Sequence, residues 1–174
     1  MKRSDYQAFF KLIASQHTDI AHQQDGRFAF DMYDDPDELL PTQPFMLTWQ
    51  TGFVLILEHY ELKLTGNRSG GFKAFYPGAF MVLGLPTASR TVASIIDEAE
   101  TVSREIWAKI AQDQKSLGGY LTIGGKLIVL DEAAGIQCNP VFGFEDGALG
   151  VRAEFIFTEQ SSSCQEHNPG KWLI

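Results

Sequence analysis

The sequence lacks most of the features that would point directly to a chemical function. It has two cysteines, Cys138 and Cys164, in 174 residues, too few for a disulfide framework. It has 14 basic against 22 acidic residues, a formal charge of −8, and no basic cluster longer than Lys2-Arg3. A protein that follows the phosphates of a nucleic acid needs a basic stripe, so we expect no sequence-specific binding of DNA or RNA.

Long hydrophobic runs are also absent. The longest apolar run, Phe53 to Leu57, is far shorter than the roughly 20 residues that span a bilayer. The N-terminal residues contain no apolar signal-peptide core and no small-residue cleavage site. We therefore expect a protein that is made in the cytoplasm and has no membrane contact.

Catalytic and nucleotide-binding motifs are incomplete. The glycine-rich segment 119–127 has the four-residue gap of a P-loop, but Gly125 stands where that motif requires lysine. Ser69 lies in GNRSGG, which does not have the spacing of a nucleophile elbow. The acidic segment 34–38 lacks the glycine and the twelfth-position glutamate of a calcium-binding loop. We predict no catalytic residue and no cofactor.

Metal ligands are likewise incomplete. Cys164 and His167 are three residues apart, and Cys138 would be a third ligand of a type that zinc accepts, but no further pair completes four. His17 lies on the apolar stripe of the first predicted helix and is interpreted as a core histidine. We predict no metal site.

The longest periodic segment runs from Thr87 to Gly118 and organises the predicted fold. Thr87 or Ser89 would cap this helix, and Gly118 would end it. Its surface would carry the ion pairs Glu100–Arg104 and Glu105–Lys109. Its apolar residues recur every three or four positions, as on one helix face: Val92, Ile95, Ile96, Ala99, Val102, Ile106 and Ile110.

The remaining pattern predicts a second helix and several strands. The helix covers residues 4–20, with a capping box formed by Ser4 and Gln7. The strands are Arg27–Tyr33, Phe45–Gln50, Gly52–Glu58, Glu61–Thr65 and Phe72–Leu85. The third is predicted to be buried on both faces, and the last to be interrupted by a bulge or a bend at Pro77-Gly78.

The last third of the chain is predicted to be less regular. Residues 119–140 are interpreted as an inserted loop or arm, and residues 158–174 as a C-terminal tail. Asp146-Gly147 predicts a hairpin turn between two β-runs. The whole chain, residues 1–174, is then a single α+β domain. Its antiparallel or mixed sheet carries the N-terminal helix and the long helix on one face.

Aromatic residues are the candidates for a functional surface. Phe75 and Tyr76 lie on a strand whose odd and even positions are both apolar, and Trp107 lies beside the apolar stripe of the long helix. The terminal Trp172 would be an exposed apolar group unless it docks on something. The predicted interface comprises Phe75, Tyr76, Trp107, Lys126 and Trp172. The pattern does not distinguish a thick core from contact with a neighbouring subunit.

The order of elements resembles a known family. A first helix, a group of strands ending in GLPT, one long helix, and a final hairpin with FGFEDG and GVRAEFIF resemble the tail-terminator and tail-completion proteins of phages and related contractile systems. Residues 34–44 and 119–140 are departures from that layout. The resemblance implies a virion tail or neck subunit, assembled in the host cytoplasm. It would form a ring of identical subunits that caps the tail tube and contacts the head connector.

A second hypothesis remains open from the same pattern. An α+β domain of this size can bind a small molecule, or act as an enzyme, in a pocket between its long helix and its sheet. The structural-subunit hypothesis instead expects no small-molecule partner.

Overall fold

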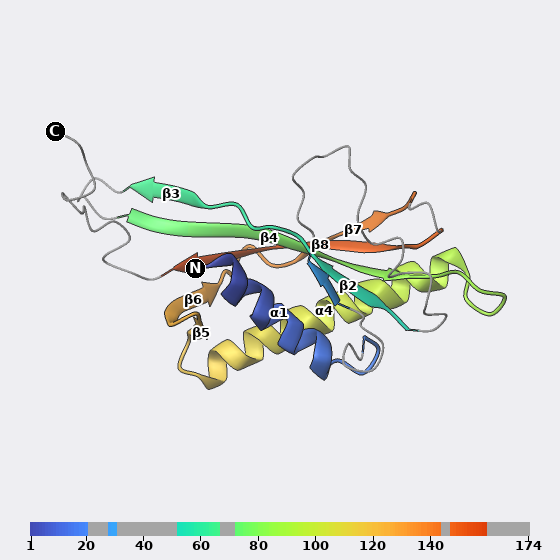
Figure 1. Ribbon diagram of the computed structural model, residues 1–174, viewed down its shortest axis with the longest axis horizontal. Coiled ribbons are helices and arrows are strands. Elements are labelled where there is room, and N and C mark those ends of the chain that lie inside the picture. Colours follow the sequence, from blue (N-terminus) through green and yellow to red (C-terminus); the bar gives the residue numbers. More distant parts are fainter. Residues whose placement is uncertain (21–27, 31–51, 67–71, 144–146, 160–174) are drawn as a thin grey trace.

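The computed structural model describes residues 1–20, 28–30, 52–66, 72–143 and 147–159. In this part of the chain, two helices lie against one face of a mixed β-sheet (Figure 1), which confirms the predicted α+β class. No helix among these residues is long and apolar enough to cross a membrane. The elements are α1 (Arg3–Gln16), β1 (Phe28–Phe30), β2 (Val54–Leu57), β3 (Lys63–Gly66), β4 (Phe72–Gly84), α4 (Val92–Ser116), β5 (Leu121–Ile123), β6 (Lys126–Leu130), β7 (Gln137–Val141) and β8 (Leu149–Glu159).

Two long antiparallel strands form the centre of the sheet. β4 and β8 pair without interruption from Ala74 opposite Glu159 to Gly84 opposite Leu149. Each long strand has two short strands along its other edge: β2 and β3 pair with β4, and β6 and β7 pair with β8. β5 adds antiparallel to β6, and β1 adds parallel to β2. The short strands and both helices are therefore arranged around one central pair.

The main core lies between the helices and one face of this sheet. Because side chains alternate along a strand, the even positions of β4 and the odd positions of β8 point to the helices. Aromatic rings fill the centre, where Phe10 of α1 stacks on Phe155 of β8 with ring centroids 5.3 Å apart. The fully buried side chains on this side include Tyr6, Phe10, Phe80, Ile95, Ile106 and Phe157.

The opposite face of the sheet carries a second, smaller apolar cluster. Val54 and Ile56 of β2 lie there with Met81 and Leu83 of β4, and all four are 5% exposed or less. Every residue of β2 is therefore buried, on one face or the other. This confirms the prediction that the FVLIL run forms a strand covered on both sides.

The long helix is confirmed, but it begins later in the sequence than predicted. α4 begins after Thr91, whose hydroxyl accepts a hydrogen bond from the backbone N–H of Ser94 at 3.2 Å. Neither predicted cap is used, because Thr87 pairs with Arg90 in a separate turn before the helix and Ser89 lies within that turn. The helix ends before Gly118, whose φ of 84° favours glycine.

One of the two predicted surface ion pairs of α4 is present. Arg104 pairs with Glu100 as predicted, but Lys109 pairs with Asp113 instead of Glu105. Glu105 instead forms a hydrogen bond with His17, directly after α1. The predicted Glu105–Lys109 pair within α4 is thus replaced, at Glu105, by a contact between α4 and the end of α1.

The first helix ends earlier than predicted and uses no capping box. α1 starts after Lys2, which makes no side-chain cap, so the Ser4–Gln7 prediction was wrong. The helix stops at Gln16, and the backbone N–H of His17 closes its last turn on Ile13. Tyr6, Phe10 and Ile13 form the buried face, as their spacing predicted.

A β-bulge lies in the strand beside β4, and not in β4 itself. Between the paired positions Leu57–Phe80 and Lys63–Phe75, the five residues 58–62 lie opposite only the four residues 76–79. The segment between β2 and β3 therefore contains one extra residue, around His59. The predicted bulge at Pro77-Gly78 was therefore wrong, because β4 pairs with β8 straight through both residues. Pro77 accepts a backbone hydrogen bond from Glu61 at 2.9 Å, so its missing N–H faces the bulge, where the ladder is already interrupted.

The segment predicted to be an irregular loop or arm is mostly strand. Residues 119–140 contain β5, β6 and nearly all of β7, all joined to the central sheet through β6 and β8. Two glycines at positive φ, Gly124 (59°) and Gly125 (75°), form the tight turn between β5 and β6. The same glycines had suggested a flexible loop in the sequence.

The final hairpin is present, and its first strand is β7. β7 pairs antiparallel with β8 from Gln137 opposite Glu154 to Val141 opposite Gly150. Thr158 and Glu159 belong to β8, so the predicted tail begins two residues too early. The predictions for residues 34–44, for Phe45–Gln50, for Asp146 and for residues 160–174 fall outside the described residues.

Replacing Gly150 by alanine should disrupt the central strand pair. A Cβ at Gly150 would lie 2.0 Å from the carbonyl oxygen of Val82 in the backbone of β4. We expect Gly150→Ala to lower the free energy of unfolding by about 3 kcal/mol or more, measured by urea denaturation.

The matched control is Gly84→Ala, for which we expect a loss of about 1 kcal/mol. A Cβ at Gly84 would meet only side-chain atoms of Ile95 and Phe53, both at 3.1 Å, and these can shift. Equal losses for the two variants would contradict the role given to Gly150.

Candidate functional site

The bulge lines a groove on the sheet face opposite the helices. The groove has a volume of about 380 Å³ and lies across β3, β4 and β8. Residues 77–79 of β4 line it, and its polar lining includes Glu58, Arg152 and Glu154. This volume is within the range of small-molecule sites, but the groove is open to solvent along its length.

One guanidinium between two carboxylates dominates the charge of this groove. Arg152 donates to both carboxylate oxygens of Glu58, at 2.6 and 2.7 Å, and also to Glu154 on its own strand. The hydrogen bonds from Arg152 to Glu58 raise the pKa of the guanidinium, outweighing the opposing effect of its partial burial. The bidentate pair joins β2 to β8 across β4, so it fixes the groove wall and leaves one carboxylate charge in excess.

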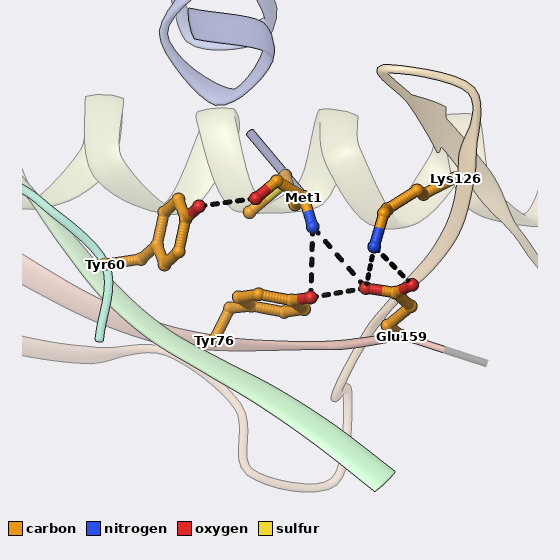
Figure 2. A network of polar contacts seen from close by, with 5 residues as sticks. All are labelled: Met1, Tyr60, Tyr76, Lys126 and Glu159. Carbon is orange, nitrogen blue, oxygen red and sulfur yellow. Dashed lines mark hydrogen bonds and ion pairs between the residues drawn. The ribbon is translucent and has the colours of Figure 1, made fainter. Parts of the chain in front are cut away.

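A second polar cluster lies on the helix side of the sheet, where β4, β6 and β8 meet α1 (Figure 2). Lys126 donates to both oxygens of Glu159, at 2.7 and 2.9 Å, and the hydroxyl of Tyr76 donates to the same carboxylate. The α-amino group of Met1 lies 3.0 Å from the Tyr76 hydroxyl and 3.4 Å from Glu159. Tyr60 donates to the carbonyl oxygen of Met1 at 2.6 Å. Glu159 is 5% exposed, so these partners, and not water, stabilise its charged carboxylate.

The pKa of Glu159 reflects competition between burial and its partners. Burial acts to raise the pKa, but hydrogen bonds from Lys126 and Tyr76 and the nearby positive charges lower it below its ordinary value. Burial also lowers the pKa of the Met1 α-amino group, with a further contribution from Lys126. The cluster is thus a partly buried ion pair, in which a buried carboxylate has several hydrogen-bond partners, and its geometry is that of a structural clamp.

A third candidate lies beside the middle of α4. A pocket of about 450 Å³ is lined by Glu98, Thr101 and Glu105 of α4 together with Phe53 and Arg90. Arg90 is fixed in place: its guanidinium lies 4.7 Å from the centre of the Phe53 ring and donates to Glu98 at 2.9 Å. The pocket therefore combines an aromatic wall with charges of both signs.

Next to this pocket, His17, Asp19 and Glu105 place one ligand atom each within 4.8 Å of one another. The hydrogen bonds argue against coordination by His17. Its Nδ1 accepts from the backbone N–H of Asp19 at 3.3 Å, so in the neutral ring Nε2 carries the proton and donates to Glu105 at 3.1 Å. A metal at Nε2 would force a proton onto Nδ1, facing that N–H. The contact is better explained as a link between the two helices.

The four predicted interface residues that the structure describes do not lie together on one surface. Tyr76 and Lys126 are brought together through Glu159, and Tyr76 is 4% exposed inside the chain. Phe75 points to the other face of the sheet, where Lys73 lies 5.0 Å from its ring centre. Trp107 packs partly against the core from α4, and its indole nitrogen has no hydrogen-bond partner among the described residues. Trp172 lies outside the described residues.

Apart from Lys126, sequence reasoning did not single out the charged residues of the groove and of the cluster around Glu159. Glu58 directly follows the buried run of β2, and Arg152 and Glu154 occupy the polar side of β8, which is a signal of an exposed sheet face. Glu159 follows an alternating strand in what had been interpreted as the tail. No sequence pattern joins Glu58 to Arg152, because they are 94 positions apart.

The comparisons with known proteins give no family assignment. No protein-family model matches this sequence, and no curated protein matches it either.

Neutralising Glu159 should produce a pH-dependent loss of stability. Because its pKa is lowered from 4.5 in the folded chain, the charged form stabilises the fold at pH values above about 4.5. That contribution is lost as the pH falls through the lower pKa of the folded state. We expect Glu159→Gln to cost about 1–3 kcal/mol at pH 7, with the difference from wild type shrinking as the pH falls from 4.5 to 3, measured by urea denaturation.

The control for this experiment is Glu132→Gln. Glu132 pairs with Lys115, and both side chains are at least one-third exposed. It also accepts a hydrogen bond from Gln114 at 3.3 Å, for which the amide oxygen of glutamine can substitute. We expect this variant to have little effect at any pH. A difference between wild type and Glu159→Gln that stays constant from pH 7 to pH 3 would contradict the proposed charge on Glu159.

Proposed function

We propose that this protein is a structural subunit that assembles with copies of itself. The observation that supports this most directly is the uncovered apolar edge of the sheet at β3. Leu64 pairs with Ala74, whose side chain is buried in the helix-side core, so Leu64 and Leu62 face the same side. They are nevertheless 44% and 56% exposed, because in this part of the sheet neither helix covers them.

The backbone of the same strand supports this proposal. All four residues of β3 are exposed, and its outer edge pairs with no other strand in the described part of the chain. In Figure 1, β3 lies beyond the N-terminal end of α1. An edge strand with free hydrogen-bonding groups and adjacent leucines is a typical surface for association.

The particular setting that we propose is a phage or phage-like tail. There, the protein would form the tail-terminator or neck ring that caps the tail tube and contacts the head connector. The resemblance to that family rests on element order, and the described residues keep the order of helix, strands, long helix and hairpin. The excess of acidic residues would reduce adhesion to DNA passing through such a ring.

Assembly can be tested on the purified chain by light scattering and native mass spectrometry over a concentration series, followed by negative-stain imaging. We expect multimers of defined size, and ring-shaped particles when purified tail-tube protein of a contractile system is added. A monomer at every concentration, with and without tube protein, would contradict the proposal. The acidic surface should keep the chain soluble in these conditions.

The pocket beside α4 supports a second candidate function, the binding of a small molecule. Its volume of about 450 Å³ suits a ligand, and Arg90, held over Phe53, would contact an anionic group. This function needs no assembly, so it predicts a monomer that responds to ligand.

A ligand screen by thermal denaturation would test this second function. Under it, we expect at least one small carboxylate or phosphate compound to raise the melting temperature of the wild-type chain, but not of Arg90→Ala. Lys11→Ala removes an exposed charge on α1 and serves as the control. The absence of any shift dependent on Arg90 would count against a ligand pocket.

A further inference from the structure

We propose that two copies of this chain pair through the outer edges of β3, antiparallel and about a two-fold axis at Leu62. This inference rests on the proposed self-assembly and names the contact that carries it, a second copy of the chain. It does not depend on the phage setting.

The backbone direction selects which residues can take part. The N–H of Glu61 donates inward to Pro77, at 2.9 Å, so Glu61 and Lys63 use their backbone groups within the sheet. Leu62 and Leu64 lie between such positions, and their N–H and C=O groups point outward from the edge. A partner strand would therefore bond to Leu62 and Leu64.

Charge then selects the register. With Leu62 opposite its own copy, Glu61 of each chain faces Lys63 of the other, and two opposite-charge cross-strand pairs form. In the alternative register, the two-fold axis lies at Lys63 instead of Leu62. Lys63 of one chain would then face Lys63 of the other, and no carboxylate would lie opposite either lysine. Glu61 and Lys63 already lie 3.0 Å apart within one chain, with side chains 71% and 63% exposed. Both groups are thus available to a second copy.

Apolar contact supports the same register. Leu62 would meet Leu62, and Leu64 would meet Tyr60, all on the helix-side face. The part-buried ring of Tyr60 already packs against Tyr6 and Tyr76, with ring centroids about 5 Å apart. The second copy would thus extend an existing apolar surface onto the two leucines that the helices leave uncovered.

Symmetry defines what this contact can build. An isologous two-fold contact closes after two copies, so it makes a dimer and cannot by itself close a ring. In a ring, a second and different surface would have to join these dimers. Loss of the β3 contact would therefore break such a ring as well, whereas loss of the second surface would leave the β3 dimer intact.

Charge exchange at β3 tests the register. We expect Glu61→Lys and Lys63→Glu, each alone, to raise the dimer dissociation constant about tenfold or more, because each creates two like-charge pairs. The double variant Glu61→Lys/Lys63→Glu should restore dimerisation. Lys11→Glu makes the same charge change as Lys63→Glu on an exposed site of α1, and should leave the dimer intact.

Cross-linking supplies an independent measurement. In a background with both cysteines replaced by serine, Leu62→Cys should form an intermolecular disulfide on oxidation, because directly opposed residues have Cα atoms about 5.5 Å apart. Leu64→Cys should not, because its two copies would be offset by four residues, about 13 Å.

The outcomes separate this inference from the proposed function. A wild-type monomer, dimerisation indifferent to both single charge variants, or preferential cross-linking at Leu64 would each overturn the β3 register. Larger assemblies that persist in the single variants would overturn the register alone. A β3 dimer that never forms rings, even with tube protein, would overturn the tail-ring function alone.

Discussion

The continuous pairing of β4 with β8 is the interaction on which the rest of this structure depends. Both helices pack on the face that these strands share, and each outer strand is attached to one of them directly or through one neighbour. Two glycines of these strands allow close approaches that the pair needs. Gly150 brings β8 against the backbone of β4, and Gly78 leaves room for Tyr6 and Phe155 beneath it. A chain that could not form this pair would lose its core and both sheet faces together.

The parts of the fold that were predictable are those whose signal is local and long. α4 shows three- and four-residue spacing over 25 residues, and β2 is an apolar run too short for a helix and too uniform for a half-exposed strand. β5 and β6 were missed because strands of three and five residues leave little periodicity to detect. The bulge was assigned to the wrong strand, because Pro77-Gly78 marks an interrupted ladder without saying which partner carries the extra residue.

The charged cluster around Glu159 and the Glu58–Arg152 pair of the groove were much less predictable, because their contacts join residues that are far apart in the sequence. Glu159 and the Met1 α-amino group are 158 positions apart, and Glu58 and Arg152 are 94 apart. Composition gives these residues no special weight, because a charged residue beside a strand usually faces solvent. Tyr76 was singled out for a different reason, as an aromatic residue on a strand whose odd and even positions are both apolar. In the structure its ring is buried within the chain, and its hydroxyl donates to Glu159.

The bulge connects the two candidate surfaces physically. Before it, the odd residues of β2 face the helices; after it, the even residues of β3 do, because one extra residue reverses the alternation. This reversal places Leu62 and Leu64 on the helix side, next to Tyr60, and Glu61 and Lys63 on the groove side with Glu58. Without the extra residue, the leucines would face the groove and the charges would face the core edge. A single residue around His59 therefore determines both the charged wall of the groove and the apolar edge that we propose for association.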